Sequence, residues 1–213
     1  DNYFSLVIFF VILFLIIYSF IKTEEMKLKF FKLFINLGLV MILASFIMIV
    51  YKYLVTTGYI NHIGPQIASL SSSLYNGTEL YHDLESFKRY SLLYGPYLYI
   101  FNNISMNFLS FSIYTSKLLG VFCGVLNIFI FYLISRSITK LNYIAIIIST
   151  LITSLCCFFP LKFIYNQTDP IIMICINLTL LALTINKNPN TKYLMICLFS
   201  GIAINLKIHS ILL

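Results

Sequence analysis

The sequence predicts an all-α protein, a polytopic bundle of membrane-spanning helices, and two observations support this fold class. Of the 213 residues, 60% are hydrophobic and only 10% are charged, whereas soluble domains carry about 25% charged residues. The apolar residues also form runs of the length needed to cross a bilayer, which takes about 20 residues of helix. This composition excludes a soluble cytosolic enzyme, a disordered tail and a soluble nucleic-acid-binding protein.

Six apolar runs predict six membrane spans. The first, residues 2–21, is free of charge and lacks the basic start and small-residue cleavage site of a signal peptide. The other five runs are residues 33–51, 118–135, 141–161, 170–186 and 193–212. A further segment, residues 97–111, is uncharged but short and contains Asn102 and Asn103. It fits either a tight span or a helix that lies along the membrane interface.

The basic residues predict the orientation. If segment 97–111 lies on the surface, eight of the 14 Lys and Arg residues fall in three short loops on one side, residues 22–32, 136–140 and 187–192. If the segment spans the membrane, seven basic residues fall on each side, so the asymmetry favours a helix along the interface. Short cytoplasmic loops are enriched in Lys and Arg, so these three loops are predicted to be cytoplasmic. Loops 52–117 and 161–169 then face outward. The chain begins without Met and stops within an apolar run, so we expect residues 1–213 to be a single transmembrane domain from the N-terminal part of a longer protein.

Residues 52–96 of the outward loop form the only substantial polar segment of the sequence. Its residues 64–75 begin with Pro65, place Ile67, Leu70 and Leu74 at helical spacing, and precede Gly77. This pattern predicts an amphipathic helix lying on the membrane. Further along, Lys88 and Arg89 precede Tyr94-Gly95-Pro96. A cationic pair beside a rigid turn suits the phosphate of a lipid head group, although a solvated linker would have a similar composition.

A series of short motifs in this region resembles a known family. The motifs are Asn61-His62-Ile63-Gly64-Pro65, Ile67-Ala68-Ser69, Gly77 with Leu80-Tyr81-His82, Arg89-Tyr90-Ser91, Tyr94-Gly95-Pro96, Ser116-Lys117-Leu118, Thr168-Asp169-Pro170 and Lys207. In this order, over about residues 55–213, they resemble the GT-C superfamily of membrane glycosyltransferases. Within it, the resemblance is to glycosyltransferase family 39, to protein mannosyltransferase-like enzymes and to lipid A aminoarabinose transferase-like enzymes.

The resemblance implies a membrane enzyme of the bacterial cytoplasmic membrane. Such an enzyme moves a sugar, with inversion, from a polyprenyl-phosphate donor to a lipid, glycan or protein acceptor on the outer face. The implied catalytic residues are Asp83 or Glu85 as the base, together with His62 and Asn61. The implied substrate-binding residues are His82, Lys88, Arg89, Tyr94, Asp169 and Lys207. No metal ligands, cofactor or nucleic-acid partner are assigned, and the need for a divalent cation stays open.

One departure from the family pattern concerns the base. GT-C enzymes usually take the acceptor proton with an acidic residue of the first outward loop, and at the matching positions this chain has Asn61 and Gly64. Either Asp83 or Glu85 replaces that acid, or this copy is inactive. Two other classes of protein therefore remain open: a transporter or lipid flippase, and a non-catalytic membrane scaffold. A transporter needs polar or charged groups near the bilayer midplane, whereas the spans carry scattered asparagines, Asn36, Asn127 and Asn177, and no acid or base near their middle.

Two residues near the outward face, and the five cysteines, also have plain structural interpretations. Asp169 fits an N-cap for a helix that begins at Pro170, and Lys162 fits a lysine whose charged end reaches out of the membrane. The five cysteines lie inside apolar runs without metal-ligand spacing, which is typical of small buried apolar residues.

Overall fold

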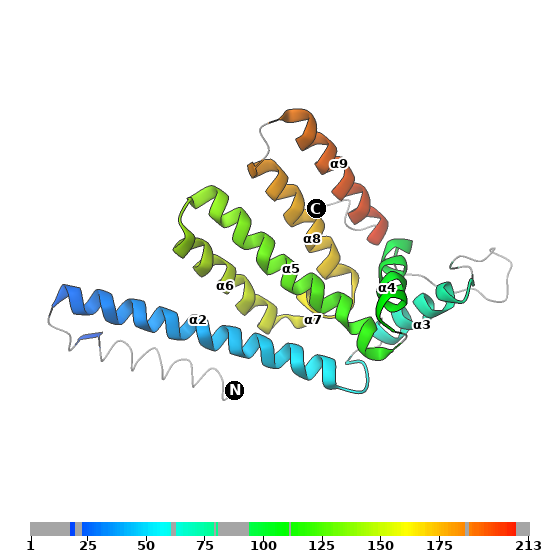
Figure 1. The fold of residues 1–213 in the computed structure, drawn as a ribbon, viewed down its shortest axis with the longest axis horizontal. Helices are drawn as coiled ribbons and strands as arrows, with labels where there is room; N and C mark the ends of the chain where they lie inside the picture. The colour runs from blue at the N-terminus through cyan, green and yellow to red at the C-terminus, as the bar shows by residue number, and fades with distance from the viewer. Residues whose placement is uncertain are drawn as a thin grey trace. The chain divides into compact units, whose positions relative to one another are not determined.

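The computed structural model describes residues 18–19, 23–60, 63–78, 80, 94–110, 112–185 and 188–207. Within these residues every regular element is a helix, as the sequence predicts (Figure 1). The helices are α2 (Glu24–Val55), α3 (Ile63–Tyr75), α4 (Pro96–Leu109), α5 (Ile113–Thr139), α6 (Asn142–Phe158), α7 (Pro160–Phe163), α8 (Thr168–Ile185) and α9 (Pro189–Leu206).

Three of the described helices are long and apolar enough to cross a membrane, which indicates a multi-pass membrane protein. They are α2, α5 and α8. α6 is apolar but has only 17 residues, and α9 carries Asn190, Lys192 and Asn205 among its apolar residues. The first predicted span, residues 2–21, lies outside the described residues except for Tyr18 and Ser19.

The predicted span at 141–161 is divided into two helices. Pro160 disfavours a helical conformation for the residue before it, and Phe159 accordingly leaves the helical region with φ −126° and ψ 58°. The chain then makes the single turn of α7 and continues without regular structure over residues 164–167. This irregular segment leads directly into α8.

The chain divides into two compact units, residues 1–42 and 43–213. In the first unit, α2 begins with an ion pair of 2.7 Å between Glu25 and Lys29, four residues apart on the helix. Pairs at this spacing stabilise a helix by a few tenths of a kcal/mol. Leu33, Leu37 and Val40 follow, each more than half exposed, as expected for a helix that faces lipid.

In the second unit, α5 packs against α6 and α8, and α8 packs against α9. α4 contacts α3, α5 and α9, and Figure 1 shows α3 and α4 at the end of the bundle where α5 and α8 begin and α9 ends. One apolar cluster there includes the fully buried Ile67, Leu98 and Leu206. A second cluster joins the last turns of α2 to α5 and α6 and includes Tyr53 and Cys156.

α3 confirms the helix predicted for residues 64–75, but its apolar face is covered by protein. Ile67 and Leu70 are buried in the cluster with α4 and α9. The helix ends in a Schellman motif, in which Gly77 takes φ +76° and the amides of Gly77 and Thr78 donate to the carbonyls of Leu74 and Ser73. The lipid contact that the sequence suggested for this face is therefore replaced by contacts with neighbouring helices.

Two glycines on α5 allow the irregular segment to approach very closely. A Cβ on Gly120 would lie 2.3 Å from the carbonyl oxygen of Ile164, and one on Gly124 would lie 2.8 Å from that of Phe163. Both distances are shorter than real side chains tolerate, so these two positions must lack a side chain. The Gly-x-x-x-Gly spacing thus fixes the backbone just before α8 against α5.

Candidate functional site

Three charged side chains from separate parts of the chain meet where α8 begins. The Nζ of Lys162 lies 2.6 Å from Oδ2 of Asp169, and the Nζ of Lys207 lies 3.6 Å from Oδ1. We call this group the Lys162–Asp169–Lys207 cluster. Two ammonium groups against one carboxylate leave a formal charge of +1, so the cluster can attract an anion.

The fold explains why these residues meet. Lys162 lies on the single turn of α7, Asp169 in the first turn of α8, and Lys207 directly after α9. A carboxylate is favoured at a helix N-terminus by the helix dipole. The side chain of Asp169 is 20% exposed, whereas that of Lys162 is 63% exposed. Exposed ion pairs contribute little to stability, so Lys162 is free to contact a ligand at small cost.

Tyr94 borders the cluster. Burial raises its pKa above the usual 10.0, the negative charge of Asp169 raises it further, and the charge of Lys162 lowers it. The phenol therefore stays protonated and available as a hydrogen-bond donor. The pKa of Lys162 is raised in turn, because it donates a hydrogen bond to Asp169 and feels its charge.

Gly95 connects this tyrosine to α9. Its amide donates to the carbonyl of Leu206 over 3.0 Å, and a Cβ at this position would lie 1.6 Å from the carbonyl oxygen of Asn205. The φ of Gly95, −69°, is open to any residue, so it is this close approach to the backbone of Asn205 that requires glycine. Pro96 then begins α4 at a position where its missing amide is no loss. The Tyr-Gly-Pro turn is thereby held beside Lys207.

A buried lysine lies at the same end of the bundle and binds three backbone carbonyls. Lys117, on the first turns of α5, is fully buried, and its Nζ donates to the carbonyls of Tyr53, Thr56 and Gly58 over 2.9, 2.6 and 2.8 Å. These contacts show that the end of α2 and the start of α5 lie together. This lysine belongs to the Ser116-Lys117-Leu118 motif, but no role was predicted for it from the sequence.

Four buried polar residues form a second network nearby. The side-chain amide of Asn102 donates to the hydroxyl of Ser71 over 3.1 Å, and that of Asn166 donates to Oδ1 of Asn102 over 3.1 Å. The backbone amide of Asn166 donates to the hydroxyl of Tyr53 over 3.0 Å. The side chain of Asn102, on α4, therefore has one partner on α3 and one in the irregular segment that precedes α8. Among the described residues, Oδ1 of Asn166 is a buried atom without a hydrogen-bond partner.

The structure describes part of the set of site residues expected from the sequence. It brings together Tyr94, Asp169 and Lys207, three of the predicted substrate-binding residues. Asp169 is not an N-cap, because α8 already begins at Thr168, and Lys162 forms an ion pair with it. Seven other predicted site residues lie outside the described residues: Asn61, His62, His82, Asp83, Glu85, Lys88 and Arg89.

The described residues contain no group of three His, Cys, Asp or Glu side chains close enough to hold a metal ion. All five cysteines are free thiols. No protein-family model, no curated protein and no solved structure matches this chain.

Proposed function

We propose that the protein is a membrane glycosyltransferase whose Lys162–Asp169–Lys207 cluster binds the phosphate of a polyprenyl-phosphate sugar. The sugar is transferred to a lipid, glycan or protein acceptor on the outer face of the membrane. One observation supports this function best: Tyr94, Asp169 and Lys207 come from three motifs far apart in the sequence and meet at one end of the helices.

The chemistry of the cluster suits a lipid phosphate. Lysine is a common phosphate ligand and acts as a compact positive charge. Lys162 and Lys207 can each bond a phosphate oxygen while Asp169 keeps the two ammonium groups close together. Negative charge grows on the phosphate as the sugar leaves, and the two lysines stabilise that charge. The protonated hydroxyl of Tyr94 adds a neutral donor.

In this proposal the outward loop supplies the remaining groups. Asp83 or Glu85 takes the proton from the acceptor hydroxyl. These two carboxylates of the outward loop are the nearest replacements for the acid that the family pattern has at the position of Asn61. His62 and His82 contact the acceptor and the donor, and Lys88 and Arg89 share the phosphate. The apolar surfaces of the spans accommodate the polyprenyl tail.

The polar residues inside the spans do not favour a transporter. The side-chain amide of Asn177 donates to Oδ1 of Asn127 over 2.7 Å, and that of Asn127 donates to the carbonyl of Pro170 over 3.0 Å. Both asparagines are fully buried. Hydrogen bonds of this kind hold transmembrane helices together, here α5 and α8.

Binding of the donor phosphate can be tested without knowing the sugar. Labelled undecaprenyl phosphate is bound to the purified protein in lipid nanodiscs, and the double variant Lys162→Gln/Lys207→Gln is compared with the wild type. Loss of two charge-assisted contacts should weaken binding at least tenfold. The control is Lys52→Gln, which removes an exposed lysine from the last turn of α2. Equal affinity in the double variant and the wild type would disprove the assignment.

The base is tested by transfer. Asp83→Asn and Glu85→Gln are assayed beside Asn61→Asp with a polyprenyl-phosphate sugar, and loss of the true base should slow turnover about 10²–10⁴-fold. If neither loss matters and Asn61→Asp creates turnover, the wild-type chain is a degenerate transferase.

A further inference from the structure

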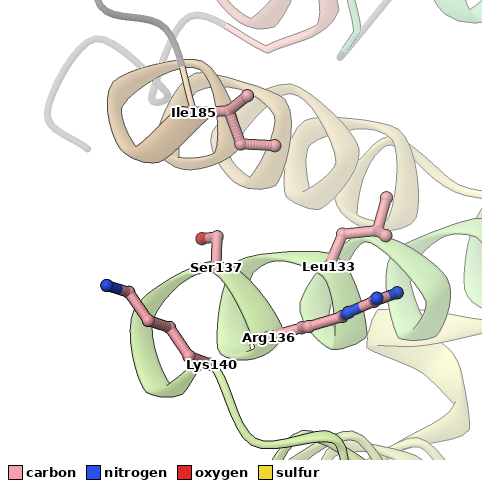
Figure 2. A pocket seen from close by; sticks show the side chains of 5 residues that line it. All are labelled: Leu133, Arg136, Ser137, Lys140 and Ile185. Atoms are coloured by element: carbon pink, nitrogen blue, oxygen red, sulfur yellow. The ribbon is translucent and has the colours of Figure 1, made fainter.

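A hollow of about 450 Å³ lies between the last turns of α5 and α8. Its lining residues are Leu133, Arg136, Ser137, Lys140 and Ile185 (Figure 2). α5 has 27 residues and is therefore about 40 Å long. The hollow is thus at the opposite end of α5 from Lys117, in the region predicted to face the cytoplasm, and is distinct from the Lys162–Asp169–Lys207 cluster.

The hollow combines two cations with apolar walls. Figure 2 shows Ser137 of α5 pointing toward Ile185 of α8, with Lys140 on one side and Arg136 and Leu133 on the other. The hydroxyl proton of Ser137 is already used, because Oγ donates to the carbonyl of Ile134 over 2.8 Å. Arg136 and Lys140 are therefore the groups that can donate to a ligand.

The local charge favours an anion even after the helix ends are counted. The C-terminal ends of α5 and α8 each contribute about −0.5 charge, and the N-terminal end of α6 contributes about +0.5. Two full positive charges then leave the site at about +1.5. In the described part of the chain, neither Arg136 nor Lys140 has a carboxylate within ion-pair distance.

We propose that this hollow binds the head-group phosphate of an anionic phospholipid. A lipid fits better than a free phosphate because Leu133 and Ile185 continue into the apolar surfaces of α5 and α8, where the glycerol and acyl chains would lie. Basic pockets between transmembrane helices bind anionic lipid head groups in this way. The site is independent of the proposed transferase function.

The backbone at Lys140 permits a clean test. Lys140 follows α5 in the left-handed conformation, with φ 56°, and asparagine adopts this conformation more readily than most residues. Lys140→Asn therefore removes the charge and keeps the turn. Arg136→Gln removes the second charge with a residue of similar helix propensity.

Retention of lipid by the purified protein is measured by native mass spectrometry during titration with phosphatidylglycerol or phosphatidylcholine. The wild type should retain phosphatidylglycerol selectively. The double variant Arg136→Gln/Lys140→Asn should bind it about 25-fold more weakly, since each cation near the membrane surface contributes about fivefold. Arg136→Lys, which keeps the charge, should retain most of the affinity. Lys192→Gln, a cation of α9 that does not line the hollow, should bind like the wild type.

Three results would overturn the proposal. They are undiminished lipid retention in the double variant, an equal loss in Lys192→Gln, and displacement of the lipid by excess inorganic phosphate, which would indicate a soluble anion as the ligand. Thermal unfolding of each variant separates a loss of binding from a loss of folding.

Discussion

The Nζ of Lys117 donates a hydrogen bond of 2.9 Å to the backbone carbonyl of Tyr53, joining the start of α5 to the end of α2. The carbonyls of Thr56 and Gly58 accept the other two N–H groups, so all three donors of the ammonium group are used. The same nitrogen lies 5.1 Å from the centre of the Tyr53 ring, within reach of a cation–π interaction. One carbonyl in the last turn of α2 and two carbonyls of the residues that follow it are thereby satisfied by a side chain.

Lys117→Met should destabilise the protein strongly. Methionine fills a similar volume but cannot donate, so three carbonyls lose their partner, and the expected loss in the free energy of unfolding is about 2–4 kcal/mol. Unfolding in detergent measures it. Lys52→Met, which changes an exposed lysine on the last turn of α2, should have little effect. Similar losses in both variants would show that the buried contacts of Lys117 are unimportant.

Gly120→Ala should also be destabilising, because the added methyl group would meet the carbonyl of Ile164 at 2.3 Å. Overpacking of this kind costs about 1–3 kcal/mol. Gly201 on α9 is the matched control: no atom lies within 4 Å of its Cβ position, so Gly201→Ala should be neutral or stabilising by up to about 1 kcal/mol. Equal unfolding temperatures for the two variants would contradict the close packing described for α5.

Tyr94 should ionise above the usual tyrosine range. Its pKa is raised by burial and then by Asp169, so folding favours the protonated phenol. This contribution to stability is complete below the unfolded pKa of 10.0 and disappears as the pH rises through the folded pKa. Asp169→Asn removes the repulsion and should lower the pKa of Tyr94.

The tyrosinate absorbance of each protein, minus that of its Tyr94→Phe counterpart, isolates this one group. An unchanged midpoint in Asp169→Asn would show that the carboxylate does not act on Tyr94.

The orientation of the bundle predicts which positions an impermeant maleimide can reach. Cysteine is introduced at Asn76, after α3, or at Asn142, at the start of α6, in a Cys197→Ser background; all three native residues are exposed. Asn76→Cys should react in intact cells and Asn142→Cys only after lysis. The reverse pattern would invert the predicted topology.

Hydropathy located the helices better than it located their ends. The apolar run at 33–51 lies inside α2, but the helix begins at Glu24 because Glu25 and Lys29 continue it with charged residues. The run at 141–161 crosses a proline, and the helix stops at Phe158. Apolar character reports where a chain prefers lipid, whereas capping, ion pairs and proline decide where the helix itself begins and ends.

The candidate site was predictable where its residues belong to local motifs. Tyr94, Asp169 and Lys207 were chosen from short sequence patterns, and the fold places them together. Lys117 and Asn166 were not chosen, because their partners are distant in the sequence: Lys117 bonds a carbonyl 64 residues away, and Asn166 bonds Asn102, also 64 residues away. The Ser116-Lys117-Leu118 motif includes the lysine, but no local pattern marks a contact with so distant a partner.

The bond between Lys117 and Tyr53 also sets an order of events during synthesis. Chains grow at about 5–20 residues per second, so the 64 residues added after Tyr53, up to and including Lys117, take roughly 3–13 s to make. Throughout that interval the carbonyls of Tyr53, Thr56 and Gly58 have only water or lipid head groups as partners, and an unsatisfied carbonyl in hydrocarbon costs several kcal/mol. The end of α2 must therefore stay at the membrane surface until α5 has been made and Lys117 donates to these carbonyls.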